Sequence, residues 1–317
     1  MTVPFIGPED IEAHLAWADV TDALRAGHRR PRAAIADGLV RRGSDGLLTR
    51  SAWIDGLGAA VKTATVVPGN AADSLPTIHG RVTLYDDRTG IPDAILDFHL
   101  VTRWKTAGDS LLGAQFLARP DSRRILILGA GAVARTLVSA YSSHFRDATF
   151  RIWNRTPAGA VTLVAEAPTG LDIDVAGDLA GAVREADIIC GATMAIRPVL
   201  RGAWLRPGQH LDLIGSYRPD MREVDDDAIS RSSLFADSLE TTLGHSGEFL
   251  IPLAAGIMSK TDIRGDLYDL VAGKTGRASP DEITLFKNGG GAHLDLMTAR
   301  RILETWRRIT SETQAPP

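Results

Sequence analysis

The stretch Arg124-Ile-Leu-Ile-Leu-Gly-Ala-Gly-Ala-Val-Ala134 decides the fold of this 317-residue chain. Its first five residues form an apolar run of the length of a buried strand, and the rest fits G-x-G-x-x-A before an amphipathic helical segment. In this context Gly129 permits a tight turn and Gly131 leaves room for a diphosphate, which the backbone N–H groups at the helix start can bind. The residues expected to bind the diphosphate of a dinucleotide are Gly129, Gly131, Ala132 and Val133.

A polar segment follows the next predicted strand, where NAD-binding proteins usually carry an acid for the ribose hydroxyls. This chain has Asn154, Arg155 and Thr156 there. Because a guanidinium pairs with a 2′-phosphate and a threonine hydroxyl donates to it, the segment predicts NADP(H), with NAD(H) as the alternative. A solvated arginine in a strand-end turn is the other interpretation. Thr193 and Met194, after a later strand, are expected to line the cofactor, although a plain connection would look the same.

The periodicity of the chain changes after a polar, proline-containing segment that ends at Arg123. From there, short apolar runs alternate with helical segments, which predicts a doubly wound parallel sheet, the Rossmann fold, over residues 119–290. The predicted strands are 124–128, 149–153, 171–175, 187–190 and 210–214.

The remaining residues mix helices with strands that alternate or carry β-branched side chains, such as 62–67 and 81–85. Helices are expected over 102–117 and 292–309 from their apolar spacing. We therefore predict an α/β protein in which residues 1–118 and 291–317 form a discontinuous α+β domain beside the Rossmann domain.

Composition excludes several classes of function. The net charge of −4 gives no electrostatic reason for nucleic-acid binding. No apolar run approaches the ~20 residues of a membrane span, and the N-terminus lacks a secretory pattern, so we expect a cytoplasmic protein without membrane association. The single Cys190 cannot form an intrachain disulfide and is expected in the core. The histidines show no metal-ligand spacing, so no metal site is predicted.

Basic residues in the first part of the chain are the candidates for substrate binding. Lys62 lies in the strand-like segment Val61-Lys-Thr-Ala-Thr-Val-Val-Pro-Gly-Asn70. It either points into a cleft to bind a carboxylate or is an exposed lysine at a strand end. Lys105, four residues before Asp109, either lines the same site or forms a surface i,i+4 pair. Arg50 and Arg32 fall in loop-like segments and are weaker candidates.

Six ordered segments resemble the ornithine cyclodeaminase and mu-crystallin family over nearly the whole chain. They are Val61-Lys-Thr-Ala-Thr-Val-Val-Pro-Gly-Asn70, Leu84-Tyr-Asp-Asp-Arg-Thr-Gly90, the Thr106-Ala helix, Leu128-Gly-Ala-Gly, Gly265-Asp-Leu267 and Glu282-Ile-Thr-Leu-Phe-Lys287. The family contains NAD-dependent cyclodeaminases, alanine dehydrogenases and NAD(P)H-dependent reductases of cyclic ketimines, and its members are typically homodimers that pair through the substrate domain. The resemblance thus implies a small imino or amino acid as substrate.

The resemblance also implies roles for individual residues. The carboxylate-binding lysine of the family falls on Lys62 and a threonine of the same pocket on Thr77. The family's arginine before Thr-Ala is here Lys105, and its N-terminal arginine has Arg32 as the nearest match, with Arg50 as a substitute. The segment Asn288-Gly-Gly-Gly-Ala-His-Leu-Asp295 departs from the family pattern at Asn288 and His293. His293 is either a proton donor or a residue of the helix start.

The family's cyclodeaminases carry a catalytic aspartate after a glycine pair, and this chain departs from that pattern. Gly215-Ser216 replaces the pair, Tyr217 takes the aspartate's place, and Asp220 reads as a turn residue. We therefore expect NADPH-dependent reduction of a cyclic 2-carboxy imine, Δ1-pyrroline-2-carboxylate or Δ1-piperideine-2-carboxylate. The alternatives are an ornithine cyclodeaminase, an amino-acid dehydrogenase, and an NADP-dependent small-molecule binding protein of the mu-crystallin type.

Overall fold

The computed structural model describes residues 2–314 and divides the chain into two compact units. Unit 1 comprises Met1–Lys105 and Ala292–Pro317, and unit 2 comprises Thr106–Gly291. The sequence predicts domain boundaries after residues 118 and 290. In the structure, the chain passes from unit 1 to unit 2 after residue 105, inside helix α3 (Phe98–Leu117), and returns to unit 1 after residue 291. A change of periodicity cannot locate a boundary that falls within a continuous helix.

Unit 1 is built on a six-stranded sheet with the order β1-β6-β5-β4-β3-β2. β1 pairs with β6 in parallel and the other neighbours are antiparallel. The predicted strands 62–67 and 81–85 are confirmed and are longer than expected, while the β2–β3 hairpin was not predicted. The strands are β1 (Phe5–Ile6), β2 (Ala34–Arg42), β3 (Asp45–Ile54), β4 (Gly58–Val66), β5 (Ile78–Tyr85) and β6 (Pro92–Asp97).

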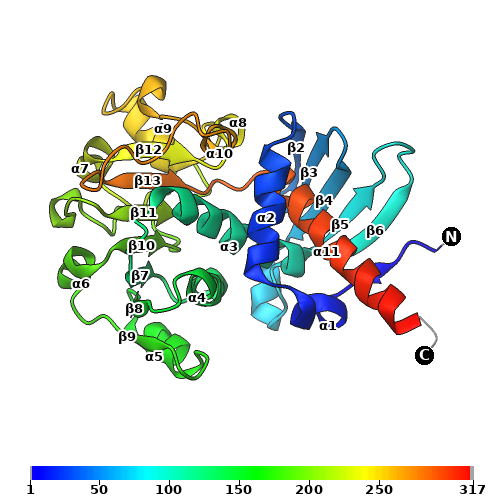
Figure 1. The fold of residues 1–317 in the computed structure, drawn as a ribbon, viewed down its shortest axis with the longest axis horizontal. Helices are drawn as coiled ribbons and strands as arrows, with labels where there is room; N and C mark the ends of the chain where they lie inside the picture. The colour runs from blue at the N-terminus through cyan, green and yellow to red at the C-terminus, as the bar shows by residue number, and fades with distance from the viewer. Residues whose placement is uncertain (1, 315–317) are drawn as a thin grey trace. The chain divides into compact units, whose positions relative to one another are not determined.

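Two helices cover one face of this sheet. α11 (Ala292–Gln314) packs on α2 (Trp17–His28) and contacts β3, β4 and β5 (Figure 1). Apolar residues of α11 recur at helical spacing and are buried, among them Leu294, Met297 and Ile302. The expected helix 292–309 is confirmed. The short helices of unit 1 are α1 (Pro8–Ile11), η1 (Glu12–His14) and η2 (Pro68–Asp73).

Unit 2 is a seven-stranded sheet with the order β12-β13-β11-β10-β7-β8-β9, in which every pair is parallel. The strand order reverses between β7 and β10, as in a doubly wound fold, so the Rossmann prediction is confirmed. The strands are β7 (Arg124–Leu128), β8 (Thr149–Trp153), β9 (Asp172–Val175), β10 (Ile188–Gly191), β11 (His210–Leu213), β12 (Ser233–Ala236) and β13 (Thr284–Lys287).

All five strands predicted for this sheet are present within one residue at each end, whereas β12 and β13 were not predicted. Cys190 lies in β10 with no solvent exposure, as expected. The helices of unit 2, besides the end of α3, are α4 (Ala132–His144), α5 (Pro157–Ala165), α6 (Leu179–Glu185), η3 (Gly202–Trp204), α7 (Asp226–Arg231), α8 (Leu239–Thr242), α9 (Gly247–Ala254), η4 (Lys260–Asp262) and α10 (Leu267–Val271).

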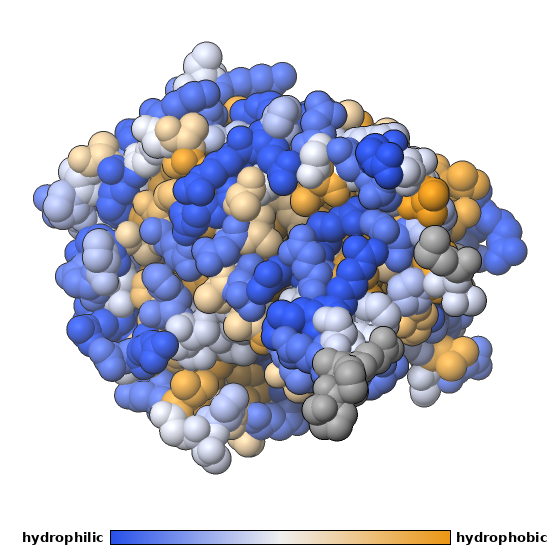
Figure 2. Space-filling model, turned by 45° about the vertical axis from the view of Figure 1, so that its right-hand side comes forward, coloured by the Kyte–Doolittle hydropathy of each residue, from blue (hydrophilic) through white to orange (hydrophobic). Residues whose placement is uncertain are grey.

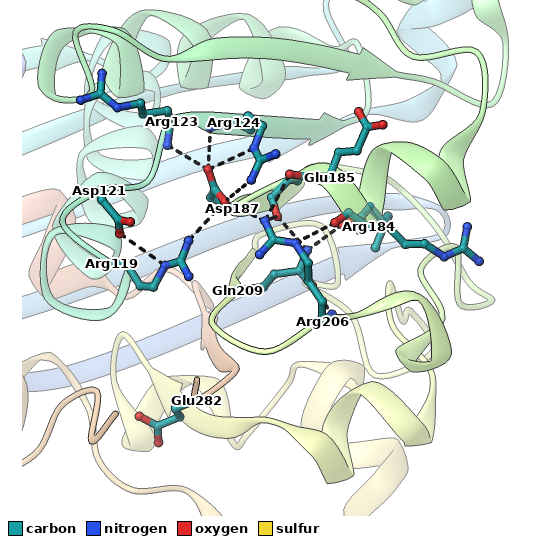
Figure 3. Close-up of polar contacts among 12 residues, drawn as sticks. Arg119, Asp121, Arg123, Arg124, Arg184, Glu185, Asp187, Arg206, Gln209 and Glu282 are labelled. Carbon is teal, nitrogen blue, oxygen red and sulfur yellow. Dashed lines mark hydrogen bonds and ion pairs between the residues drawn. The ribbon is translucent and has the colours of Figure 1, made fainter. Parts of the chain in front are cut away.

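An arginine cluster fixes the amino ends of the central strands around the carboxylate of Asp187 (Figure 3). Arg206, Arg124 and Arg119 approach Oδ1 at 2.7, 3.1 and 3.4 Å. The backbone N–H groups of Arg123 and Arg124 donate to Oδ2, both at 3.0 Å. Burial opposes ionisation of Asp187, but these hydrogen bonds prevail and hold its pKa well below the ordinary value. The cluster ties β7, β10 and the segment before β11 together at the edge opposite the glycine turn.

Candidate functional site

Lys62 lies on the helix-covered face of the unit 1 sheet. Alternate residues of β4 face inward, so Lys62 shares this face with Ala60 and Ala64 and is only 6% exposed. Its ammonium donates to Thr102 Oγ1 at 2.6 Å and lies 4.4 Å from the ring centroid of Phe98. The interpretation of Lys62 as an exposed strand-end lysine is therefore wrong.

Asp295, in the first turns of α11, joins the two predicted lysines. Its Oδ1 accepts from Lys62 Nζ at 2.9 Å and its Oδ2 from Lys105 Nζ at 3.3 Å. Lys105 is buried, so its interpretation as half of a surface pair is also wrong. Sequence reasoning missed Asp295, although an acid on the apolar side of a predicted helix was a usable signal. Lys62, Lys105 and Asp295 are called the basic cluster below.

The basic cluster carries an excess of positive charge in a buried place. Burial lowers the pKa of Lys62 to about 8, against the attraction of Asp295. Burial also opposes ionisation of Asp295, but Lys105 and Lys62 lower its pKa to about 2. One carboxylate thus faces two ammonium groups, and the surplus charge favours a second carboxylate, supplied by a ligand.

Arg50 lies on β3 directly opposite Lys62 in the β3–β4 register, on the same face of the sheet. Its prediction as a loop residue is wrong, because the polar segment around it forms a long hairpin. The guanidinium pairs with Asp37 at 2.8 Å, and its charge adds to the lowering of the pKa of Lys62. Arg50 therefore adds a third cation to the neighbourhood of the basic cluster.

Two other predicted substrate residues lie in connections that precede strands. Thr77 directly precedes β5 and its carbonyl accepts from Val67 N–H at 2.8 Å, so it lies about 16 Å along β4 from Lys62. Arg32 is exposed in the connection between α2 and β2, as the expected loop position implies. The structure does not bring Thr77 to the basic cluster, and the roles of both residues stay predictions.

His293 lies in the first turn of α11 with no solvent exposure, in edge-to-face contact with His28 at 5.5 Å between ring centroids. Burial, with His28 and Lys105, lowers the pKa of His293 well below the ordinary value. The ring is therefore neutral at neutral pH, and no imidazolium is available there as a proton donor. Its location agrees with the helix-start interpretation, and a role in binding stays a prediction.

The glycine turn of unit 2 has the geometry that a dinucleotide needs. Gly129 adopts a φ of +117°, and a Cβ at this position would meet the carbonyl oxygen of Ala192 at 2.5 Å. A Cβ on Gly131 would face open space, so this side of the turn is free for a diphosphate. α4 begins at Ala132, and the N–H groups of Ala132 and Val133 belong to its first turn.

The segment Asn154-Arg155-Thr156, which is expected at the adenosine side of the cofactor and is called the adenosine-side segment below, follows β8. β8 is the neighbour of β7 in the sheet. Asn154 Nδ2 donates to the Thr156 carbonyl at 2.8 Å, which shapes the turn before α5. Arg155 and Thr156 are exposed. Within residues 2–314, no hydrogen bond or ion pair engages the Arg155 guanidinium, so it is available to an anionic ligand.

The loop after β10 contains Thr193 and Met194. Met194 is 73% exposed, whereas Thr193 donates its N–H and its hydroxyl to Glu223 Oε1 at 2.8 and 2.7 Å. The Thr193 side chain is thus engaged within the protein, and the expected contact of this loop with the cofactor stays a prediction. Sequence reasoning did not single out Glu223, which has no local motif around it.

The segment that would hold a cyclodeaminase's aspartate offers no free carboxylate. Tyr217 is half exposed, and Asp220 forms a bidentate pair with Arg218 at 2.9 Å in an exposed turn, as its turn assignment implies. Among residues 2–314, no group of three His, Cys, Asp or Glu side chains is arranged to hold a metal ion. No helix in that range has the length and apolarity needed to cross a membrane.

Comparison with known proteins agrees with these features. The sequence model of the ornithine cyclodeaminase/mu-crystallin family matches residues 45–309. A Δ1-pyrroline-2-carboxylate reductase of Paracoccus denitrificans is 50% identical over 302 residues, which cover 94% of this chain and 95% of that protein. The ketimine reductase mu-crystallin of Rattus norvegicus is 30% identical, over 95% of this chain and 97% of its own length.

A solved structure shows the same fold. It is the Δ1-pyrroline-2-carboxylate reductase of Thermococcus litoralis in complex with NADH and L-proline, with a TM-score of 0.90 and 28% identity. The match covers 97% of this chain and 98% of that one. Fold, glycine turn, basic cluster and sequence likeness together lead to one assignment: the chain belongs to the ornithine cyclodeaminase/mu-crystallin family.

Proposed function

We propose that this protein reduces a cyclic 2-carboxy imine, Δ1-pyrroline-2-carboxylate or Δ1-piperideine-2-carboxylate, to the cyclic amino acid with NADPH. The observation that carries the proposal is the surplus of positive charge where the buried Lys62 and Lys105 share the single carboxylate of Asp295. The 50% identity with a Δ1-pyrroline-2-carboxylate reductase supports the same substrate class.

The residues of unit 2 fit a nicotinamide dinucleotide. The open space before Gly131 and the start of α4 suit the diphosphate, and the available Arg155 suits a 2′-phosphate. When bound, the cofactor supplies a hydride to the imine carbon. The imine nitrogen takes a proton, so the C=N bond becomes CH–NH.

The basic cluster binds and orients the substrate in this proposal. Lys62 and Lys105 donate to the substrate carboxylate, and Asp295 keeps both ammonium groups in place while balancing part of their charge. Because the carboxylate is adjacent to the imine carbon, anchoring it fixes the position of the reacting bond. Lys62, with a pKa of about 8, remains protonated at neutral pH and can also deliver a proton.

The cyclodeaminase alternative needs a carboxylate that accepts a proton from the substrate amine. Tyr217 occupies the position concerned, and the nearby Glu223 already accepts three hydrogen bonds within the protein. Both of its carboxylate oxygens are thus already engaged by donors of the protein. A small-molecule binding protein remains distinguishable by tight NADPH binding without turnover.

The decisive experiment follows reduced-cofactor absorbance with NADPH and NADH against both cyclic imines, a keto acid with ammonia, and ornithine. Oxidation of NADPH that depends on a cyclic imine supports the proposal. Ammonia release from ornithine without net cofactor consumption would establish the cyclodeaminase alternative instead.

We also propose a homodimer that pairs through the outer face of the unit 1 sheet. Val40, Leu47 and Trp53 lie on the face opposite Lys62 and are 67%, 39% and 50% exposed. On the face that Figure 2 shows, orange side chains are scattered among blue ones, at its right-hand edge among other places. Exposed apolar patches of this kind mark protein interfaces. A monomer in sedimentation equilibrium would refute the dimer, and the expected cytoplasmic location stays a prediction.

A further inference from the structure

We propose that Glu223 is a positioning residue that fixes the two loops on which the nicotinamide half of the dinucleotide rests. The proposal rests on the proposed function, since it concerns how unit 2 holds its cofactor. Glu223 is 1% exposed, lies between the half-exposed turn at Tyr217 and α7, and belongs to no recognised motif.

The carboxylate of Glu223 joins the loops that follow β10 and β11. Oε1 accepts from the N–H and the hydroxyl of Thr193, and Oε2 accepts from Gly215 N–H at 2.7 Å. Both loops lie at the carboxyl ends of adjacent parallel strands. A single buried side chain therefore sets the spacing between the two loops.

The loops approach each other so closely that Gly215 must lack a side chain. A Cβ at Gly215 would lie 2.1 Å from the Thr193 carbonyl oxygen and 2.5 Å from Glu223 Oε1. The first loop also touches the glycine turn, since the Ala192 carbonyl oxygen lies only 2.5 Å from where a Cβ of Gly129 would be. A continuous chain of contacts thus runs from the diphosphate turn to Gly215 through Glu223.

The position of these two loops in the sheet indicates that they lie under the nicotinamide half of the dinucleotide. A dinucleotide lies across the carboxyl edge where the strand order reverses, which here is between β7 and β10. Arg155 and the adenosine-side segment follow β8, on one side of β7. The other half of the dinucleotide must then extend over β10 and β11, where Thr193 and Gly215 lie.

Further buried side chains hold the segment around Glu223 in place. Its own N–H donates to Glu248 Oε2 at 2.9 Å, and Glu248 also accepts from Ser216 Oγ. Lys287, fully buried at the end of β13, is attracted to both glutamates and donates to the Leu213 carbonyl at 2.9 Å. The second loop is thus held from both sides, by Glu223 at Gly215 and by Lys287 just before it.

The test compares Glu223→Gln with wild type by isothermal titration, using NADPH and its fragment 2′-phospho-ADP-ribose, which lacks the nicotinamide. An amide can accept from only one loop and turns its NH₂ toward a donor of the other. We expect the Kd of NADPH to rise about tenfold or more while that of the fragment stays within about twofold. Equal changes for the two ligands, or no change for either, would overturn the proposal.

Two further variants complete the test. Glu282→Gln is the matched control, because Glu282 also accepts from a hydroxyl and a backbone N–H, at Ser233 and Ala278, but precedes β13 at the opposite edge. It should lower thermal stability without changing the ratio of the two Kd values. Thr193→Val removes the hydroxyl's bond to Glu223 and the long 3.4 Å bond that the hydroxyl accepts from Ala195 N–H, but keeps the backbone bond to Glu223. It should raise the NADPH Kd selectively even if Glu223→Gln does not fold. Oxidation of NADPH by the wild-type protein in the presence of a cyclic imine tests the proposed function separately from these binding measurements.

Discussion

Asp295 and Lys62 are 233 residues apart in the chain and form a 2.9 Å ion pair in the interior of unit 1. The pair places a carboxylate from the C-terminal helix against an ammonium from the middle of β4. With Lys105 on the second oxygen, the carboxylate is shared, and neither lysine is fully neutralised. An anionic ligand can therefore bind there without removing Asp295.

Replacement of Lys62 by methionine, which keeps the length of the side chain, should weaken substrate binding. Loss of a charge-assisted hydrogen bond predicts a fall in kcat/KM of about 10- to 100-fold, mostly through KM. Steady-state kinetics with the cyclic imine measure it. Lys274→Met, at a 72% exposed position, is the control and should be indistinguishable from wild type. Unchanged kinetics in Lys62→Met would remove Lys62 from the site.

Asp295→Asn should destabilise the fold. It leaves two buried ammonium groups without their counter-charge, which predicts a loss of about 3–5 kcal/mol in the free energy of unfolding. Urea denaturation measures the loss. Adding Lys62→Met to Asp295→Asn should recover part of it, because one uncompensated charge is removed. If the double variant lost the sum of the two single-variant losses in the free energy of unfolding, the Lys62–Asp295 ion pair would contribute nothing to stability.

Activity should fall as the pH rises through about 8. Burial lowers the pKa of Lys62 to about 8, so its ammonium, which binds the substrate carboxylate, is lost above that pH. Asp295, with a pKa of about 2, stays ionised throughout this range. Because Asp295 raises the pKa of Lys62, Asp295→Asn should move the alkaline limb of the kcat/KM profile to lower pH. An unmoved limb would assign the titration to another group.

Arg155→Ala should change the cofactor preference. The exposed guanidinium is expected to pair with the 2′-phosphate, so the Kd of NADPH should rise about 10-fold or more while that of NADH stays within about twofold. Fluorescence titration with both cofactors provides the comparison, and Arg88→Ala serves as an exposed control in unit 1. Tighter binding of NADH than of NADPH by the wild-type protein would contradict the predicted role.

Asp187→Asn should lower stability in a pH-dependent way. The folded pKa of Asp187 lies below its unfolded value of about 4, so its stabilisation is present above pH ~4 and is lost as the pH falls toward the folded pKa. We expect a loss of about 3 kcal/mol at pH 7, since three arginines lose their shared counter-charge. The difference between variant and wild type, measured by thermal unfolding, should shrink below pH 4. A constant difference would exclude the carboxylate's ionisation as the cause.

The sequence by itself determined the Rossmann fold and the dinucleotide turn of unit 2. Strand β7, Gly129 and the start of α4 are consecutive, so their geometry follows from local apolar patterning and glycine conformational freedom. Lys62 also stood out locally, as a charge within an apolar strand. The same local reasoning failed for Arg50, because nothing near it in sequence reveals the long β2–β3 hairpin.

Only the tertiary structure decided what surrounds these residues. Asp295 meets Lys62 and Lys105 because α11 packs across β4, and this contact depends on burial of an apolar helix face far along the chain. Glu223 likewise meets Thr193 and Gly215 only when adjacent parallel strands bring their carboxyl ends together. Such partners have no fixed spacing in sequence, because pairing between distant segments is set by which apolar faces pack, and polar groups buried with them must then find partners there.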